Sequence, residues 1–212
     1  MGGYSDAASF ILAKTFTGHV TGNLVLTAIS IASKDWSTFF RRVLAIALFL
    51  MGIILSVILE RGPTQKLSRS FLPMVLGLEI ILIPLAYCAL TSPLDARLEL
   101  FVTCMGLCQG LQNGAWRGAG GISVRSTYLT GMITTLLTTA AQKYIFQAAR
   151  VARPDPKISL LSGIWVAFVA GAALGATLVL RYNAPGILGA ALVLLSLFCY
   201  QSAAMLRRHR RT

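Results

Sequence analysis

The chain has 212 residues, of which 56% are hydrophobic and 12% are charged, and its mean hydropathy is +0.72. The charged share is about half that of an ordinary soluble domain, too small to coat the surface of a soluble globule. The hydrophobic content also excludes a disordered chain. The apolar stretches are continuous and do not alternate, which disfavours a membrane β-barrel. These observations predict an all-α, polytopic membrane protein that forms a single integral membrane domain over residues 1–212.

The net charge of +12 raises nucleic acid as a partner, but the distribution of the basic residues argues against it. They lie between the apolar runs and in the tail, which is the pattern of cytoplasmic loops that contact anionic lipids. We therefore expect a lipid bilayer, with anionic lipids at the basic loops, and no nucleic acid. The tail arginines are Arg207, Arg208, Arg210 and Arg211.

Apolar segments long enough to cross a bilayer, which takes roughly 20 residues, recur along the chain. Four are uninterrupted: residues 43–59, 71–91, 158–180 and 186–206. Two more are interrupted by stretches rich in glycine and threonine, near residues 15–23 and 114–130. Counting each interrupted segment as one crossing gives six helices, and counting each as two gives eight. The positive-inside count barely separates these topologies, but residues 4–14 are too few to span alone, which favours six.

The two halves of the chain resemble one another. Asp6 in the first half matches Asn113 in the second, and the Thr-Gly pair at 21–22 matches the pair at 130–131. If each half crosses three times, the second half is inverted relative to the first, and inverted repeats with interrupted helices are typical of transporters. We therefore predict a 3+3 inverted repeat with an interrupted first helix in each half. The pseudo-repeats cover residues 1–91 and 98–206.

The same motifs carry a resemblance to a known family. They are Gly3-Tyr4-Ser5-Asp6-Ala7-Ala8-Ser9-Phe10, Thr21-Gly22-Asn23, Gln112-Asn113 and Thr130-Gly131. The chain resembles the bacterial YoaK-like family of multi-pass membrane proteins (domain of unknown function 1275), which carries G-x-x-D-A-x-S-[FY], T-G-N, Q-N and T-G elements. The resemblance covers essentially the whole chain and implies a multi-pass protein of the cell membrane, the bacterial inner membrane, without implying a substrate or reaction. Such chains usually have roughly ten or more apolar residues before the first glycine, so we expect a short first helix.

Glu79 lies near the middle of the apolar span 71–91. A charge at that depth costs a few kcal/mol or more, so the side chain must face the bundle interior or carry a proton. We predict a proton relay at Glu79. The alternative is a structural carboxyl group that is hydrogen-bonded to a neighbouring helix.

A second set of polar residues surrounds the two interruptions, where irregular backbone at membrane depth must be buried or line a wet cavity. We predict that they meet near the centre of the bundle as a substrate-binding site: Asp6, Thr17, His19, Thr21, Asn23, Gln112, Asn113, Thr127 and Thr130. The alternative is that Asp6 caps a helix and that the glycines only allow close helix contacts. We expect no metal site, because His19 lacks further ligands at suitable spacing, and no cofactor.

These features favour a transporter or permease of a small polar solute or ion. The alternatives are a structural or accessory membrane protein without transport activity and, less favoured, a membrane-embedded enzyme. We expect no enzyme, because the sequence shows no nucleophile–base pair and no paired carboxylates on one helix turn. Glycines every four residues form smooth helix faces that favour packing, within the chain or in a homo-oligomer: Gly106, Gly110, Gly114, Gly118, Gly171 and Gly175.

Overall fold

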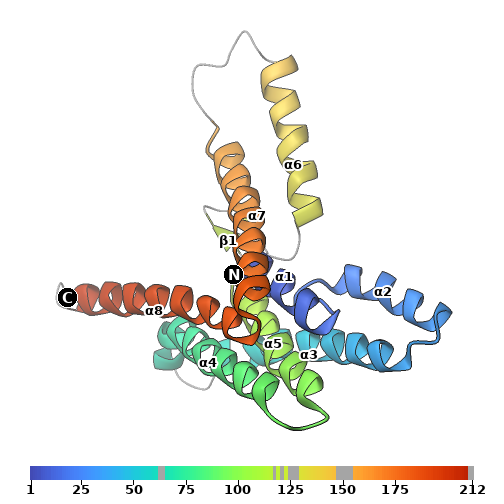
Figure 1. The fold of residues 1–212 in the computed structure, drawn as a ribbon. Helices are drawn as coiled ribbons and strands as arrows, with labels where there is room; N and C mark the ends of the chain where they lie inside the picture. Colours follow the sequence, from blue (N-terminus) through green and yellow to red (C-terminus); the bar gives the residue numbers. More distant parts are fainter. Residues whose placement is uncertain (62–64, 117, 120–121, 124–128, 147–154, 210–212) are drawn as a thin grey trace.

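The computed structural model describes residues 1–61, 65–116, 118–119, 122–123, 129–146 and 155–209, and over these residues the chain is almost entirely helical (Figure 1). The helices of the first half are α1 (Gly2–Ala13), α2 (Val20–Ala32), α3 (Trp36–Glu60) and α4 (Gln65–Thr91). Those of the second half are α5 (Arg97–Ala115), α6 (Leu129–Ala141), the π-helical η1 (Gln142–Phe146), α7 (Pro156–Tyr182), the 3₁₀ turn η3 (Ala184–Ile187) and α8 (Leu188–His209). Two short strands, β1 (Gly118–Ala119) and β2 (Ile122–Ser123), pair between α5 and α6.

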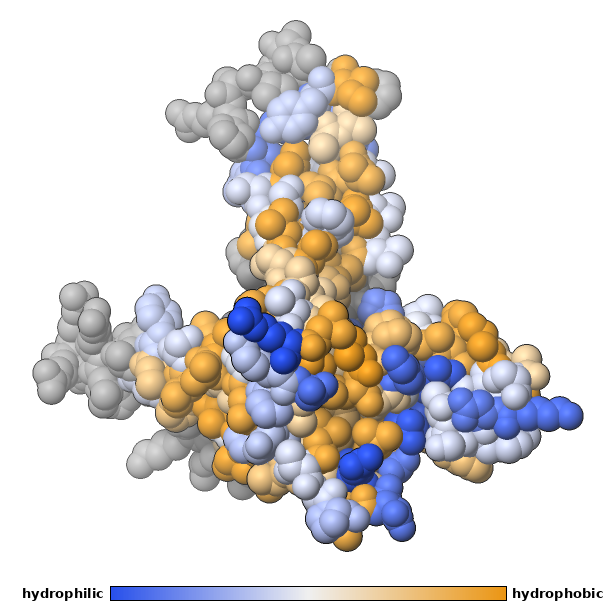
Figure 2. All heavy atoms as spheres, in the orientation of Figure 1, coloured by the Kyte–Doolittle hydropathy of each residue, from blue (hydrophilic) through white to orange (hydrophobic). Residues whose placement is uncertain are grey.

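Among the described residues, four helical segments are long and apolar enough to cross a membrane: Trp36–Glu60, Phe71–Thr91, Pro156–Tyr182 and Ala184–Ser202. They coincide with the four uninterrupted spans expected from the sequence. Large hydrophobic side chains such as Ile58, Ile81 and Leu180 are exposed, and Figure 2 shows hydrophobic residues over much of the visible face. Such a surface suits lipid rather than water. The predicted all-α polytopic membrane fold is confirmed, while the number of crossings stays a prediction.

Aspartates fix the starts of two long helices. Asp35 precedes α3 and accepts a hydrogen bond from the backbone N–H of Thr38 at 3.1 Å. Asp155 precedes α7 and accepts one from the backbone N–H of Lys157 at 2.9 Å. These side chains satisfy amide groups that have no partner inside the helix.

Helix α5 lies against both α3 and α4. Its contact with α3 is a contact of backbones, because a Cβ atom on Gly52 would lie 2.7 Å from the carbonyl oxygen of Leu107 and 2.9 Å from Cα of Gly110. Glycine permits this approach since it carries no side chain. Phe101 of α5 and Ile83 of α4 are fully buried in the main core cluster.

Helix α1 contacts both α7 and α5. A Cβ atom on Gly175 of α7 would lie 2.9 Å from Cα of Tyr4, and the buried Tyr4 hydroxyl donates to the carbonyl oxygen of Gly186. Helices α6 and α7 lie side by side and extend away from α3, α4 and α5 (Figure 1). The glycine-rich faces of α5 and α7 are therefore covered by α3 and α1 of the same chain.

Candidate functional site

The break between α1 and α2 is organised by the carboxylate of Asp6. Helix α1 ends at Ala13, and the backbone of the next residue, Lys14, is left-handed with φ of 56°. Oδ1 of the buried Asp6 then accepts hydrogen bonds from the backbone N–H groups of Thr17 at 3.0 Å and Gly18 at 2.7 Å. A buried N–H group left without an acceptor would cost about 1–3 kcal/mol. Asp6 thus has a structural role, but this role differs from the expected helix cap, because Asp6 holds residues of the break and the N-cap residue of α2 is His19.

Asn23 holds the same break from the side of α2. Its side chain accepts from the backbone N–H of Phe16 at 3.0 Å and donates to the carbonyl oxygen of Phe16 at 2.6 Å. The backbone N–H of Asn23 also bonds the carbonyl oxygen of His19 at 3.0 Å. Because these bonds close the first turn of α2, residues 20–23 are helical. The prediction of irregular backbone over 15–23 is wrong for those residues, and the break covers residues 14–19.

His19 lies at the edge of this cluster. Its Nδ1 is 3.8 Å from Oδ2 of Asp6, and its side chain is 38% exposed, with its ring next to that of Phe16. A protonated His19 would form an ion pair with Asp6. Within the described part of the chain, no group of three or more His, Cys, Asp or Glu side chains is arranged to hold a metal ion.

Arg42 is a buried charged residue that the sequence did not single out. It is 8% exposed and donates to the carbonyl oxygens of Lys14 and Leu26 and to the hydroxyl of Ser30. It thereby ties α3 to the C-terminal end of α1 and to the second half of α2. The signal in the sequence was the Arg pair at 41–42 directly before an apolar span.

Glu79 is fully buried between helices, as the sequence predicts for an acid at that depth. Its Oε2 accepts a hydrogen bond of 3.5 Å from Nε2 of Gln112 on α5. Its Oε1 has no hydrogen-bond partner among the described residues. A buried carboxylate with a single long hydrogen bond is poorly stabilised as an anion.

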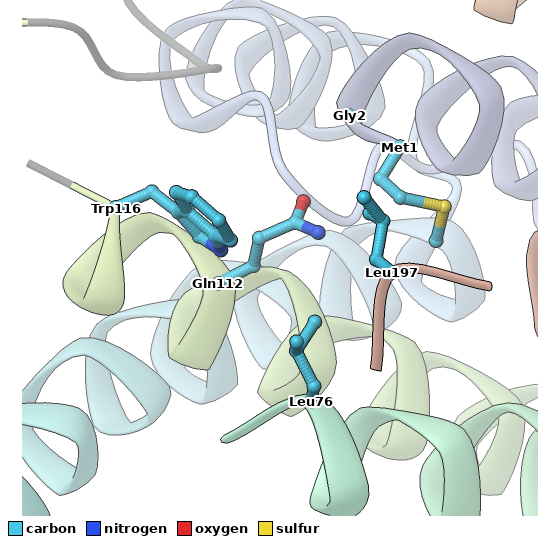
Figure 3. A pocket seen from close by; sticks show the side chains of 6 residues that line it. All are labelled: Met1, Gly2, Leu76, Gln112, Trp116 and Leu197. Carbon is cyan, nitrogen blue, oxygen red and sulfur yellow. The ribbon is translucent and has the colours of Figure 1, made fainter. Parts of the chain in front are cut away.

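A cavity of about 250 Å³ lies beside this pair. Figure 3 shows the lining residues, which come from α1, α4, α5 and α8 and the ends of these helices: Met1, Gly2, Leu76, Gln112, Trp116 and Leu197. Leu76 precedes Glu79 by about one helical turn, and Gln112 donates to it. Glu79 does not line the cavity itself but contacts its lining through Gln112.

The structure separates the predicted site residues into two groups. Asp6, Thr17, His19 and Asn23 meet at the α1–α2 break, whereas Gln112 and Glu79 meet between α5 and α4. Of the predicted binding set, Gln112 alone lines the described cavity. The others lie as follows: Thr21 and Thr130 are exposed, Asn113 is buried on α5, and Thr127 lies outside the described residues. A single site that unites both motif sets stays a prediction.

Comparison with known proteins places these features in a family. Residues 1–200 match the family described as protein of unknown function DUF1275. The chain is 25% identical, over 146 residues, to the UPF0700 transmembrane protein YoaK of Bacillus subtilis (strain 168), a match that covers 68% of this chain and 65% of that protein. The chain thus spans about two thirds of the length of this curated relative. No solved structure matches it significantly. Because the family match covers nearly the whole chain, this multi-pass membrane protein belongs to the DUF1275 family.

Proposed function

We propose that this protein is a transporter or permease of a small polar solute or ion in the bacterial cell membrane. One observation carries the proposal: Glu79 is fully buried in a membrane-length helix, and one of its carboxylate oxygens lacks any described partner, beside a cavity. Ionisable residues inside a membrane are expensive and mark solute or proton pathways by default. The Bacillus relative, a bacterial transmembrane protein, supports the location.

The helix packing supports a scaffold of inverted repeats. A Cβ atom on Gly110 of α5 would collide with the carbonyl oxygen of Phe49 on α3, and one on Gly3 of α1 would collide with the carbonyl oxygen of Phe168 on α7. Gly3 and Gly110 are equivalent in the repeat, because they precede Asp6 and Asn113 by the same three positions. Each half thus packs the first part of its interrupted helix, α1 or α5, against the second crossing of the other half, α7 or α3.

Two further correspondences agree with this scaffold. Residues 73–77 read Pro-Met-Val-Leu-Gly and residues 185–189 read Pro-Gly-Ile-Leu-Gly, both early in the last span of a half. Asp35 and Asp155 cap the helices that precede those spans. In transporters built from inverted repeats, the substrate site lies near the midplane where the repeats meet, and the cavity is lined by α1 and α4 of one half and α5 and α8 of the other.

Flux measurements test transport. The purified full chain is reconstituted in liposomes with a defined panel: an amino acid, a sugar, an organic cation, an organic anion and inorganic ions. At least one member should cross faster than in empty liposomes, and Glu79→Gln should slow it by about tenfold or more, the effect of losing one charge-assisted interaction. Asp95→Asn is the matched control, because it removes the same charge from an exposed turn.

The outcomes separate the proposal from its alternative. If no panel member crosses faster than in empty liposomes, or if Glu79→Gln carries the full wild-type flux, transport through this site is wrong. The structural or accessory role is then favoured, in line with the fully hydrogen-bonded Oδ1 of Asp6 at the α1–α2 break.

A further inference from the structure

The charge balance around Glu79 restricts what the cavity can hold. No Lys or Arg side chain in the described part of the chain forms an ion pair with Glu79. The titratable groups that act on it electrostatically are the α-amino group of Met1 on the α1 side and the Cys108 thiol on α5, and Gln112 is its neutral hydrogen-bond donor. An unpaired buried ion costs several kcal/mol. Glu79 must therefore be neutralised, either by a proton or by a positive charge that enters beside it.

The lining of the cavity adds a second restriction. Leu76, Leu197 and the Met1 side chain are apolar, Trp116 offers an aromatic ring, and Gln112 supplies an amide (Figure 3). Among aromatic side chains, tryptophan attracts cations most strongly over its face. A volume of about 250 Å³ lies below the roughly 300–1,000 Å³ of drug-sized pockets. An apolar cavity with one aromatic ring, one amide and one acid in contact with its lining suits a small cation that carries an apolar group.

We propose that the cavity binds a small organic ammonium ion and that this cation exchanges with a proton held on Glu79. The proposal rests on the proposed transport function and names its cargo class. In the empty cavity the carboxyl group of Glu79 keeps its proton. When the cation enters, the proton leaves to water and the carboxylate pairs with the cation, so the site stays neutral in both states. One cation in one direction is thus matched by one proton in the other.

Benzyltrimethylammonium is a suitable probe, because its quaternary nitrogen carries no proton and any proton released on binding comes from the protein. Titration calorimetry of the full chain in two buffers of different ionisation enthalpy counts the protons released. We expect about one proton per cation near neutral pH, since one carboxyl group exchanges. We also expect binding at least tenfold tighter than that of neopentylbenzene, the neutral molecule of the same shape.

Two variants complete the test. Glu79→Gln should release no proton and bind the cation at least tenfold more weakly, whereas Asp95→Asn should match the wild type. If Glu79→Gln does not fold, the wild-type proton count and the neutral isostere decide alone.

The proposal is overturned if the wild type releases no proton, if the neutral isostere binds as tightly as the cation, or if Glu79→Gln binds the cation unchanged. Flux of a neutral or anionic solute that depends on Glu79 would overturn the cation class and leave transport standing. Cation binding with proton release but no flux in liposomes would leave the exchange site standing and overturn transport.

Discussion

Replacing Gly52 by alanine tests the close packing that positions α5 and the residues it carries. The new Cβ atom would lie 2.7 Å from the carbonyl oxygen of Leu107 and 2.9 Å from both Cα of Gly110 and the backbone nitrogen of Leu111. All three are backbone atoms, so no flexible side chain can move aside. Ordinary contact begins at 3.4 Å, which requires α3 and α5 to separate by about 0.7 Å near this point.

The expected loss of stability follows from two opposing effects. Overpacking of a well-packed contact costs about 1–3 kcal/mol, and a gap of this size forfeits a quarter to a half of each neighbouring dispersion contact. Alanine regains up to about 1 kcal/mol of helix propensity relative to glycine. We therefore expect Gly52→Ala to lose about 1–2 kcal/mol net, which for a chain of this size lowers Tm by roughly 2–8 °C.

The assay heats the protein in detergent and measures the temperature at which the buried Cys108 on α5 becomes reactive toward a maleimide dye. Cys88 and Cys199 are exposed and are replaced by serine in every protein compared, so the maleimide reaction of Cys104 and Cys108 reports the opening of the core around α5. The control is Gly163→Ala on α7, where a Cβ atom would meet nothing within 4 Å. That variant should be as stable as the wild type or more so. A Gly52→Ala protein that melts at or above the wild-type temperature would refute the packing of α3 on α5 described here.

Three other expectations follow from the contacts described above. Asp6→Ala leaves two buried N–H groups without acceptors and should lower stability by about 2–4 kcal/mol, whereas Asp6→Asn keeps an acceptor oxygen and should cost less; the Tm difference checks this. Arg42→Lys removes the forked guanidinium donors that reach several oxygens at once, and it should lower the free energy of unfolding by about 1–3 kcal/mol. Glu99→Gln should lower it by less than about 1 kcal/mol, because the ion pair of Glu99 with Arg41 is partly exposed. Hydrogen bonds from Thr38 hold the pKa of Asp35 below its ordinary 3.8; because the native value is the lower one, the cap stabilises the fold above that pH and is lost on acidification. Asp35→Asn should therefore flatten the acid side of a plot of Tm against pH.

The sequence predicts the long helices well because bilayer-length apolar runs have few alternative structures. It also locates the first interruption, since glycine and threonine cluster there, but it extends the irregular backbone too far. The helical start at Val20 depends on the side chain of Asn23 reaching back to Phe16, a contact that composition does not encode.

The sequence does not predict the hydrogen-bond partners of the buried polar residues, for a similar reason. The contact of Glu79 with Gln112 depends on the register between α4 and α5. The role of Arg42 depends on α1 and α2, which both bring hydrogen-bond acceptors to its guanidinium group. Periodicity within one helix carries no information about either arrangement.

The two buried acids differ in what their charge does, and this difference argues for Glu79 as the functional one. Each lies in a single half of the proposed repeat: Asn113 stands opposite Asp6, and the alignment of residues 73–77 with 185–189 places Ala191 opposite Glu79. Oδ1 of Asp6 satisfies two backbone donors, so an oxygen acceptor, charged or neutral, explains its presence. Glu79 satisfies one long amide bond and leaves Oε1 without a described partner. A glutamine would serve the fold there as well, without the cost of a buried charge. What only the glutamate supplies is a proton or a negative charge that can be exchanged, and exchange of that kind is a property of transport rather than of packing.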